Sequence, residues 1–145
     1  MKTPKTKTLI KKLTKICHDY IRKRDGINGE LKGHCFDCGI YCEGGNWQAG
    51  HFEPSGANGV LLRYHPQNIH GQFSGCNMAV QQERVKIAYT MKMIDTYGRS
   101  RVDALRALKR RNIKADGVFY SGLIEKYEEG DEKKIIKYLE SYPYC

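Results

Sequence analysis

Apolar residues recur at helical spacing near the start of the chain and throughout its second half. The first such stretch covers residues 8–24, with lysines opposite its apolar face, and two turn signals follow it at Asp25-Gly26 and Asn28-Gly29. The pattern of the second half predicts four helices. Three of them cover residues 76–98, 119–128 and 132–142. The other begins after an N-cap at Ser100 and turns Val102, Leu105 and Leu108 inward.

The middle of the chain has a different pattern. Residues 30–75 are rich in Gly, His, Asn and Pro and contain no long periodic run. Short apolar runs predict strands at 40–43 and 47–51, joined as a hairpin by the turn at 44–46. A loop over 53–59 and an extended segment over 60–64 are expected to follow.

These elements predict an α+β fold in a single domain, since 145 residues form one small core most economically. Its expected parts are a basic N-terminal helix (1–29), a compact core (30–98) and C-terminal helices (99–145). Such a small core gains from a structural metal.

Positive charge is concentrated in two blocks. The net charge is +9, and residues 1–24 contain nine Lys or Arg against one Asp. A second basic run covers residues 99–114. Charge alone is also compatible with a merely soluble surface, but two blocks flanking one motif region favour contacts with a nucleic-acid backbone. The predicted DNA contacts are Lys11, Lys12, Lys15, Arg22, Lys23, Arg24, Arg106, Lys109, Arg110 and Arg111.

Cysteine spacing indicates a zinc site. The start of the chain has no apolar signal region and no run is long enough to span a membrane, so a cytoplasmic location in the host cell is expected. There, C-x-x-C more often binds metal or performs redox chemistry than forms disulfides. Cys35 and Cys38 form such a pair, and Cys76 supplies a third ligand. Phe73 precedes Cys76 by three residues and cannot bind zinc, so the fourth ligand is either Cys42 or His70, with His34 and His65 weaker alternatives.

Three polar residues suit phosphodiester hydrolysis. His51 follows the predicted hairpin, and a neutral imidazole there can take a proton from water near pH 7. Asn77 directly follows Cys76, where its amide oxygen can bind Mg²⁺ or Mn²⁺ beside phosphate oxygens. Asn68 is expected to hydrogen-bond the loop backbone and to orient His51. Each of the three could also have a purely structural role when considered alone.

The strings at 48–52, 62–64, 68–72 and 76–78, together with Tyr89 and Tyr97-Gly98, resemble the NinG/Rap family of phage recombination endonucleases. The order of knuckle, histidine, asparagine and Cys-Asn also resembles HNH nucleases, and the Cys-Asn ending resembles phage endonuclease VII. The resemblance implies a zinc-stabilised HNH-like ββα-metal core, cleavage of branched DNA such as D-loops and Holliday-type junctions, and a catalytic divalent cation. It matches His51, Asn68, His70 and Asn77 to family motif positions.

The sequence departs from the family pattern in three places. Phe73 replaces a knuckle cysteine, and Gln81-Gln82-Glu83 follows where the family often has Ser-Gly-Asn or Gly-Asn. Gly50 stands where many HNH nucleases, though not this family, have a metal-binding aspartate.

The leading functional prediction is therefore a metal-dependent endonuclease acting on branched DNA, with structural Zn²⁺ and catalytic Mg²⁺ or Mn²⁺. The alternatives are an HNH nicking or homing-type nuclease acting on duplex DNA, and a non-catalytic zinc module that binds nucleic acid. Symmetric cutting of two strands would suit a homodimer, and other phage recombination proteins are further possible partners. The first helix could form that dimer interface or pack on its own core, and the sequence favours neither.

Overall fold

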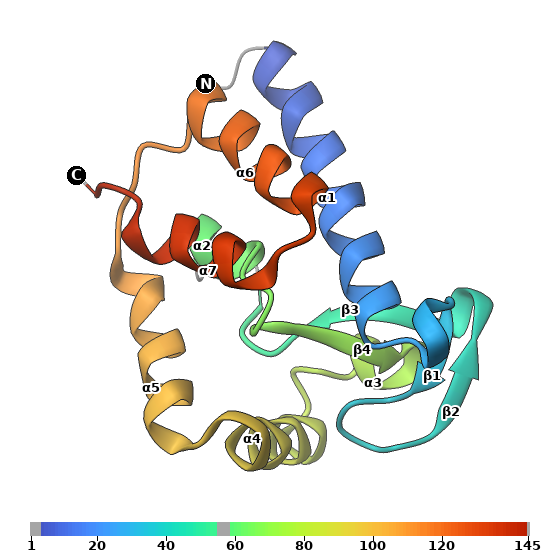
Figure 1. The fold of residues 1–145 in the computed structure, drawn as a ribbon. Helices are drawn as coiled ribbons and strands as arrows, with labels where there is room; N and C mark the ends of the chain where they lie inside the picture. The colour runs from blue at the N-terminus through green and yellow to red at the C-terminus, as the bar shows by residue number, and fades with distance from the viewer. Residues whose placement is uncertain (1–3, 55–58, 145) are drawn as a thin grey trace.

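The computed structural model describes residues 4–54 and 59–144 as an α+β protein (Figure 1). Residues 55–58, in the predicted loop, lie outside this description. The helices are α1 (Pro4–Arg24), α2 (Gly59–Arg63), α3 (Ser74–Met78), α4 (Glu83–Tyr97), α5 (Arg99–Ala107), α6 (Gly117–Glu129) and α7 (Glu132–Ser141). The strands are β1 (Lys32–His34), β2 (Tyr41–Glu43), β3 (Trp47–His51) and β4 (Ile69–Phe73). None of the described helices is long and apolar enough to cross a membrane.

The predicted strands exist, but they do not form a hairpin with each other. β1 pairs with β2, and β3 pairs antiparallel with β4, Trp47 lying opposite Phe73 and His51 opposite Ile69. The turn at 44–46 is a 3₁₀ turn between the two sheets. The hairpin prediction was therefore wrong, because the partner strands β1 and β4 were not recognised.

Trp47 explains why those partner strands are inconspicuous in the sequence. Its ring is buried, and a Cβ added at Gly33 or Gly71 would lie 2.9 or 2.2 Å from ring carbons. Both strands therefore need glycine where they face the indole, and glycine weakens the apolar alternation that predicts a strand. The indole N–H also donates to the Arg22 carbonyl oxygen (2.9 Å) at the end of α1.

The segment predicted as extended at 60–64 is instead the helix α2. Leu61 and Leu62 are both buried, and they belong to different apolar clusters. A short apolar run that is buried on both faces shows neither the alternation of a strand nor the period of a helix. Periodicity therefore could not distinguish a strand from a helix here.

The helical predictions hold with two changes. The helix predicted over 76–98 is divided into α3 and α4, with residues 79–82 between them. The residue that precedes α5 is Gly98, with φ of 86°, rather than Ser100. This backbone conformation favours glycine and lets one residue end α4 and begin α5. Val102, Leu105 and Leu108 are buried as expected.

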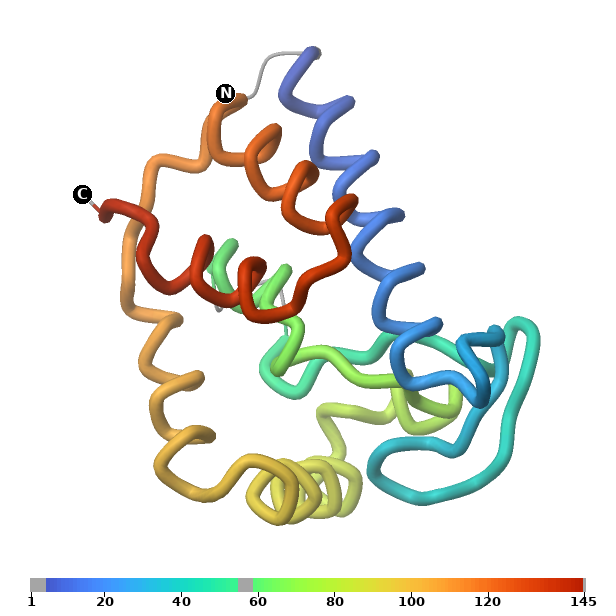
Figure 2. Tube along the Cα trace, viewed as in Figure 1, coloured from blue at the N-terminus to red at the C-terminus, as the bar shows by residue number. Residues whose placement is uncertain are grey.

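Two apolar clusters lie around the β3–β4 pair. One joins α1, α6 and α7 and includes Leu13, Cys17 and Ile21, none of which is exposed. The other joins α2, α4 and α5. In Figure 2, α4 lies on the side of the strand pair away from α6, and α5 leads from α4 back towards α7, where Arg101 pairs with Glu140. The first helix thus packs on its own core, alongside α6. This is one of the two arrangements that the sequence left open.

Arg24 belongs to the interior rather than to a DNA-binding surface. Its guanidinium donates to the carbonyl oxygens of Pro66 (2.7 Å) and Ile69 (2.8 Å) and pairs with Asp25 and Glu132, both at 2.7 Å. These partners hold the end of α1 against β4 and α7. The structure therefore gives Arg24 a structural role, which the prediction of a DNA contact did not include.

Replacing Arg24 with methionine is expected to lower the free energy of unfolding by about 3 kcal/mol, because a partly buried ion pair then loses its cation. The matched variant Lys23→Met removes an exposed charge from the neighbouring position and is expected to change stability by less than about 0.5 kcal/mol. Urea unfolding monitored by tryptophan fluorescence measures both. Equal, small effects would contradict a structural role for Arg24.

Candidate metal centre and adjoining groove

The cysteine knuckle is a tight turn after β1. The Cys35 amide donates to the Ile40 carbonyl oxygen and the Gly39 amide donates to the Cys35 carbonyl oxygen, each at 2.9 Å. Gly39 has a φ of 78°, which favours glycine at the turn. The Phe36 amide donates to the Gly71 carbonyl oxygen (2.9 Å), which ties the knuckle to β4.

The structure brings together the three cysteines predicted to bind zinc. The Sγ atoms of Cys35, Cys38 and Cys76 all lie within 4.8 Å of one another, Cys76 coming from α3. Sulfur ligands in a tetrahedral zinc site are about 3.8 Å apart, given Zn–S bonds of about 2.3 Å. The donor set therefore fits a thiophilic metal with small adjustments.

His70 is not placed to be the fourth ligand. Its Nδ1 is 3.2 Å from the Tyr89 hydroxyl oxygen and its Nε2 is 2.7 Å from that of Tyr97. Its ring stacks on Phe36 with centroids 3.9 Å apart. Because both ring nitrogens have hydrogen-bond partners in the interior, the structure corrects the prediction that His70 binds zinc and gives it a packing role.

Of the other ligand candidates, Cys42 lies on β2 opposite Gly33 of β1, the strand that leads into the knuckle. Burial raises the pKa of the Cys42 thiol, and the charge of Cys38 raises it further. His65 is fully buried, with its Nε2 2.7 Å from Glu140, and exposed His34 lies 3.3 Å from the Gly39 carbonyl oxygen. Among the described residues, Cys42 is thus the remaining candidate, although its sulfur is outside the 4.8 Å group.

His51 has one ring nitrogen available as a base. Its Nε2 lies 2.8 Å from the Arg63 carbonyl oxygen. A carbonyl only accepts, so Nε2 carries the proton in the neutral ring and Nδ1 keeps its lone pair. Burial lowers the pKa of His51 to about 4, against the opposing effect of the hydrogen bond to the Arg63 carbonyl oxygen. The imidazole is therefore neutral near pH 7, as a general base must be.

Asn68 ties the backbone of Glu53 to that of α2. Its side-chain amide donates to the carbonyl oxygens of Glu53 (3.0 Å) and Leu62 (2.9 Å), and its oxygen accepts from the Glu53 amide (2.9 Å). These are the backbone contacts expected of it. They hold the segment whose Arg63 carbonyl oxygen accepts from His51, so an effect on the histidine would be indirect.

Asn77 lies in a groove between α1, β3 and α3. Its Nδ2 donates to Gln48 Oε1 (2.9 Å), so its own oxygen is turned away from Gln48. The groove is lined by Lys15, His18, Asp19, Arg22, Gln48, Ala49 and Asn77. It therefore combines basic groups, a histidine and an amide oxygen, which suits a phosphate and a hard cation.

His18 was not predicted from the sequence, although it connects these features. It lines the same groove as Asn77, and its ring meets that of His51 edge-on with centroids 5.9 Å apart. Burial lowers the pKa of His18, and the charge of Arg22 lowers it further. The available signal was its place on the polar face of the predicted helix, between Lys15 and Arg22.

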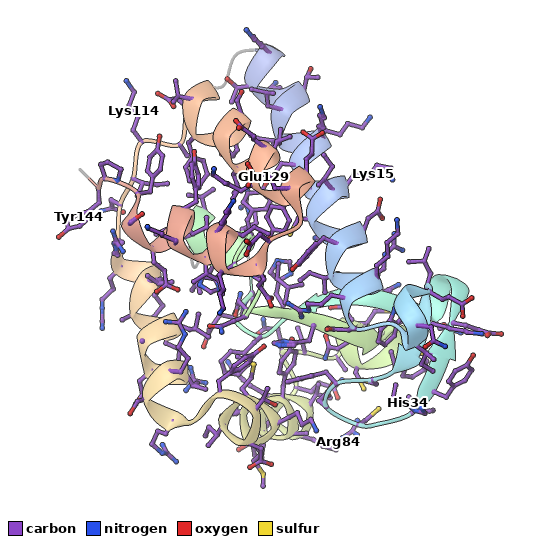
Figure 3. All side chains as sticks on the ribbon, in the orientation of Figure 1. Lys15, His34, Arg84, Lys114, Glu129 and Tyr144 are labelled. Atoms are coloured by element: carbon purple, nitrogen blue, oxygen red, sulfur yellow. The ribbon has the colours of Figure 1, made fainter. Side chains whose placement is uncertain are left out.

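The basic residues divide into exposed and engaged groups. On α1, Lys11, Lys12, Lys15 and Lys23 are exposed, and Lys15 projects away from α6 (Figure 3). Arg22 pairs with Asp19 at the groove. In the second block Arg106 pairs with Glu53 (2.8 Å) and lies over Phe52, and Arg111 donates to the carbonyl oxygens of Glu140 and Tyr142. Lys109 and Arg110 stay exposed.

DNA affinity is expected to fall about a hundredfold or more between about 50 and 200 mM salt if α1 contacts several phosphates. Replacing Lys11, Lys12 and Lys15 together with glutamine should weaken binding and flatten the slope of log affinity against log salt by about 0.9 per lost contact. Lys133, Lys134 and Lys137 on α7 are also exposed, and their triple glutamine variant is the control of equal charge. Fluorescence anisotropy measures the DNA affinity of both triple variants. An equal loss of affinity in the two would assign the effect to net charge alone.

The fold and site define a basic α+β protein with a cluster of three cysteines that could hold a metal ion, beside a polar groove. A family model described as "Bacteriophage Lambda NinG protein" matches residues 1–130, so the chain belongs to the NinG family. The match extends well beyond the motif strings and includes α1. No match was found among curated proteins or among solved structures.

Proposed function

We propose that this protein is a metal-dependent endonuclease that hydrolyses phosphodiester bonds in branched DNA during phage recombination. One observation carries the proposal. Neutral His51, with Nδ1 available, contacts His18, and His18 lines the groove that contains Asn77. The strand pair β3–β4 and the helix α3, which carry His51 and Asn77, support an HNH-like ββα-metal core.

In the proposed mechanism, His51 Nδ1 takes the proton from the attacking water. Asn77 Oδ1 would hold Mg²⁺ or Mn²⁺, which when bound polarises the scissile phosphate and neutralises charge on the leaving oxygen. Lys15 and Arg22 would hold the DNA backbone in the groove. Zinc bound by Cys35, Cys38 and Cys76 would fix α3, and with it Asn77, against the knuckle.

Incubation with a labelled four-way junction and a labelled linear duplex, each with and without Mg²⁺, tests this function. We expect Mg²⁺-dependent cleavage of the junction and little cleavage of the duplex. Equal cleavage or nicking of the duplex would favour a duplex-specific nuclease. Binding of both without cleavage in any divalent cation would favour a non-catalytic zinc module.

A further inference from the structure

Gln72 has a side-chain oxygen whose position calls for a ligand. The residue lies on β4 and is fully buried. Its Nε2 donates to Asp37 Oδ1 (2.9 Å), but its Oε1 has no hydrogen-bond partner among the described residues. A buried carbonyl oxygen without a partner is unfavourable and rare in folded proteins.

The orientation of this amide is set by its neighbour. Asp37 Oδ1, as a carboxylate oxygen, can only accept. The opposite orientation would bring Oε1 against that oxygen, with no proton between them. The Nε2 must therefore face Asp37, and Oε1 must point the other way, towards β3.

The Gln72 oxygen converges with the Asn77 oxygen at Gly50. A Cβ built on Gly50 would lie 1.7 Å from Gln72 Oε1 and 3.0 Å from Asn77 Oδ1. Gln48 accepts from the Asn77 amide nitrogen, which leaves Asn77 Oδ1 on the Gly50 side. Two amide oxygens thus approach one point beside a residue that has no side chain. Oxygen atoms that converge without a donor form the kind of site that a hard cation binds.

We propose that Gln72 Oε1 is a second protein ligand of the divalent cation, beside Asn77 Oδ1, an inference that rests on the proposed metal-dependent nuclease. Both ligands are neutral, so the protein alone binds the cation weakly, and water and DNA phosphate complete its coordination. Gly50 is required because any larger residue would take the space that the Gln72 oxygen fills.

The cysteine cluster positions both ligands. Cys76 directly precedes Asn77 in α3, and Asp37 lies between Cys35 and Cys38 in the knuckle. Asp37 Oδ1 accepts from Gln72 Nε2 (2.9 Å). The knuckle therefore orients Gln72 through Asp37, while the third cysteine anchors the helix that carries Asn77.

Mn²⁺ titration of the zinc-loaded protein, with free Mn²⁺ measured by electron paramagnetic resonance, tests this assignment without DNA. Gln72→Ala is expected to raise the dissociation constant about tenfold or more, as loss of a polar contact to a charged group does. Gln72→Glu combined with Asp37→Asn should lower it, because a charged oxygen then lies at the same reach and an amide, rather than a second carboxylate, faces the place of Gln72 Nε2. The control Gln81→Ala, at an exposed position, should leave it unchanged.

A swap of side chains tests the geometry itself. Gly50→Asp alone should weaken Mn²⁺ binding and stability, because its Cβ would collide with the Gln72 oxygen. Combined with Gln72→Ala, the aspartate has room and brings an oxygen to the same place. The double variant is therefore expected to bind Mn²⁺ more tightly than either single variant, a non-additivity typical of contacting residues.

The outcomes separate this assignment from the proposed function. If Asn77→Ala weakens Mn²⁺ binding but Gln72→Ala binds it as the wild type does, Gln72 is not a ligand and the nuclease proposal stands. If the wild-type protein binds no Mn²⁺ even with a non-cleaved junction present, both are overturned. Weaker binding in both alanine variants, with rescue in the double variant, supports both.

Discussion

Replacing Cys35 with serine is expected to remove bound zinc and most of the stability of the fold. Wild-type protein should contain about one zinc per chain. A metal that binds only the native state contributes about 4 kcal/mol when its free concentration is a thousand times its dissociation constant. The core is small, so the variant should be largely unfolded at 37 °C. Elemental analysis and circular dichroism measure the two losses.

Two other cysteines serve as comparisons. Cys17 is fully buried in the first apolar cluster, where its thiol donates to the Tyr127 hydroxyl (3.3 Å). Cys17→Ser should retain the full zinc content. Cys42→Ser should lose zinc only if Cys42 moves in as the fourth ligand. Well-folded Cys35→Ser protein with unchanged stability, or zinc-free wild-type protein that folds normally, would contradict the structural zinc site.

Replacing His51 with alanine is expected to reduce cleavage about 10²–10⁴-fold, the usual contribution of a positioned general base. Zinc content, fold and junction affinity should be kept, because the imidazole contributes one hydrogen bond, to the Arg63 carbonyl oxygen. Single-turnover cleavage of a labelled junction measures the loss. The exposed residue His34 provides a control, and His34→Ala with normal zinc content should cleave normally. Normal cleavage by His51→Ala would remove His51 from the mechanism.

The helices were the part of the fold that sequence patterns predicted best. Their buried apolar residues recur at helical spacing, which can be read from the sequence, as Leu13, Cys17 and Ile21 illustrate in α1. β1 and β4 were missed because they carry Gly33 and Gly71, which the Trp47 ring requires. Similarly, α2 is too short for a period to develop, so its two buried leucines indicated only an apolar run.

The parts of the candidate site that could be predicted are those whose residues form a short motif along the chain. The C-x-x-C spacing of Cys35 and Cys38 indicated a metal site, and the structure adds Cys76 to it as expected. The roles of His70 and Arg24 depend on partners distant in sequence, Tyr89 and Tyr97 for the histidine and Glu132 for the arginine. Such tertiary contacts leave no local signal, and the same is true of the contact between His18 and His51.

The central claim, that this groove is a metal-dependent nuclease site, is tested most directly by the metal dependence of Asn77→Ala. Single-turnover cleavage of a four-way junction would be measured over a range of Mn²⁺ concentrations for this variant and the wild type. Because the proposed defect is in metal binding, the variant should be strongly impaired at low Mn²⁺ and recover part of its rate at high Mn²⁺. The same rate and the same metal dependence in both proteins would contradict the account.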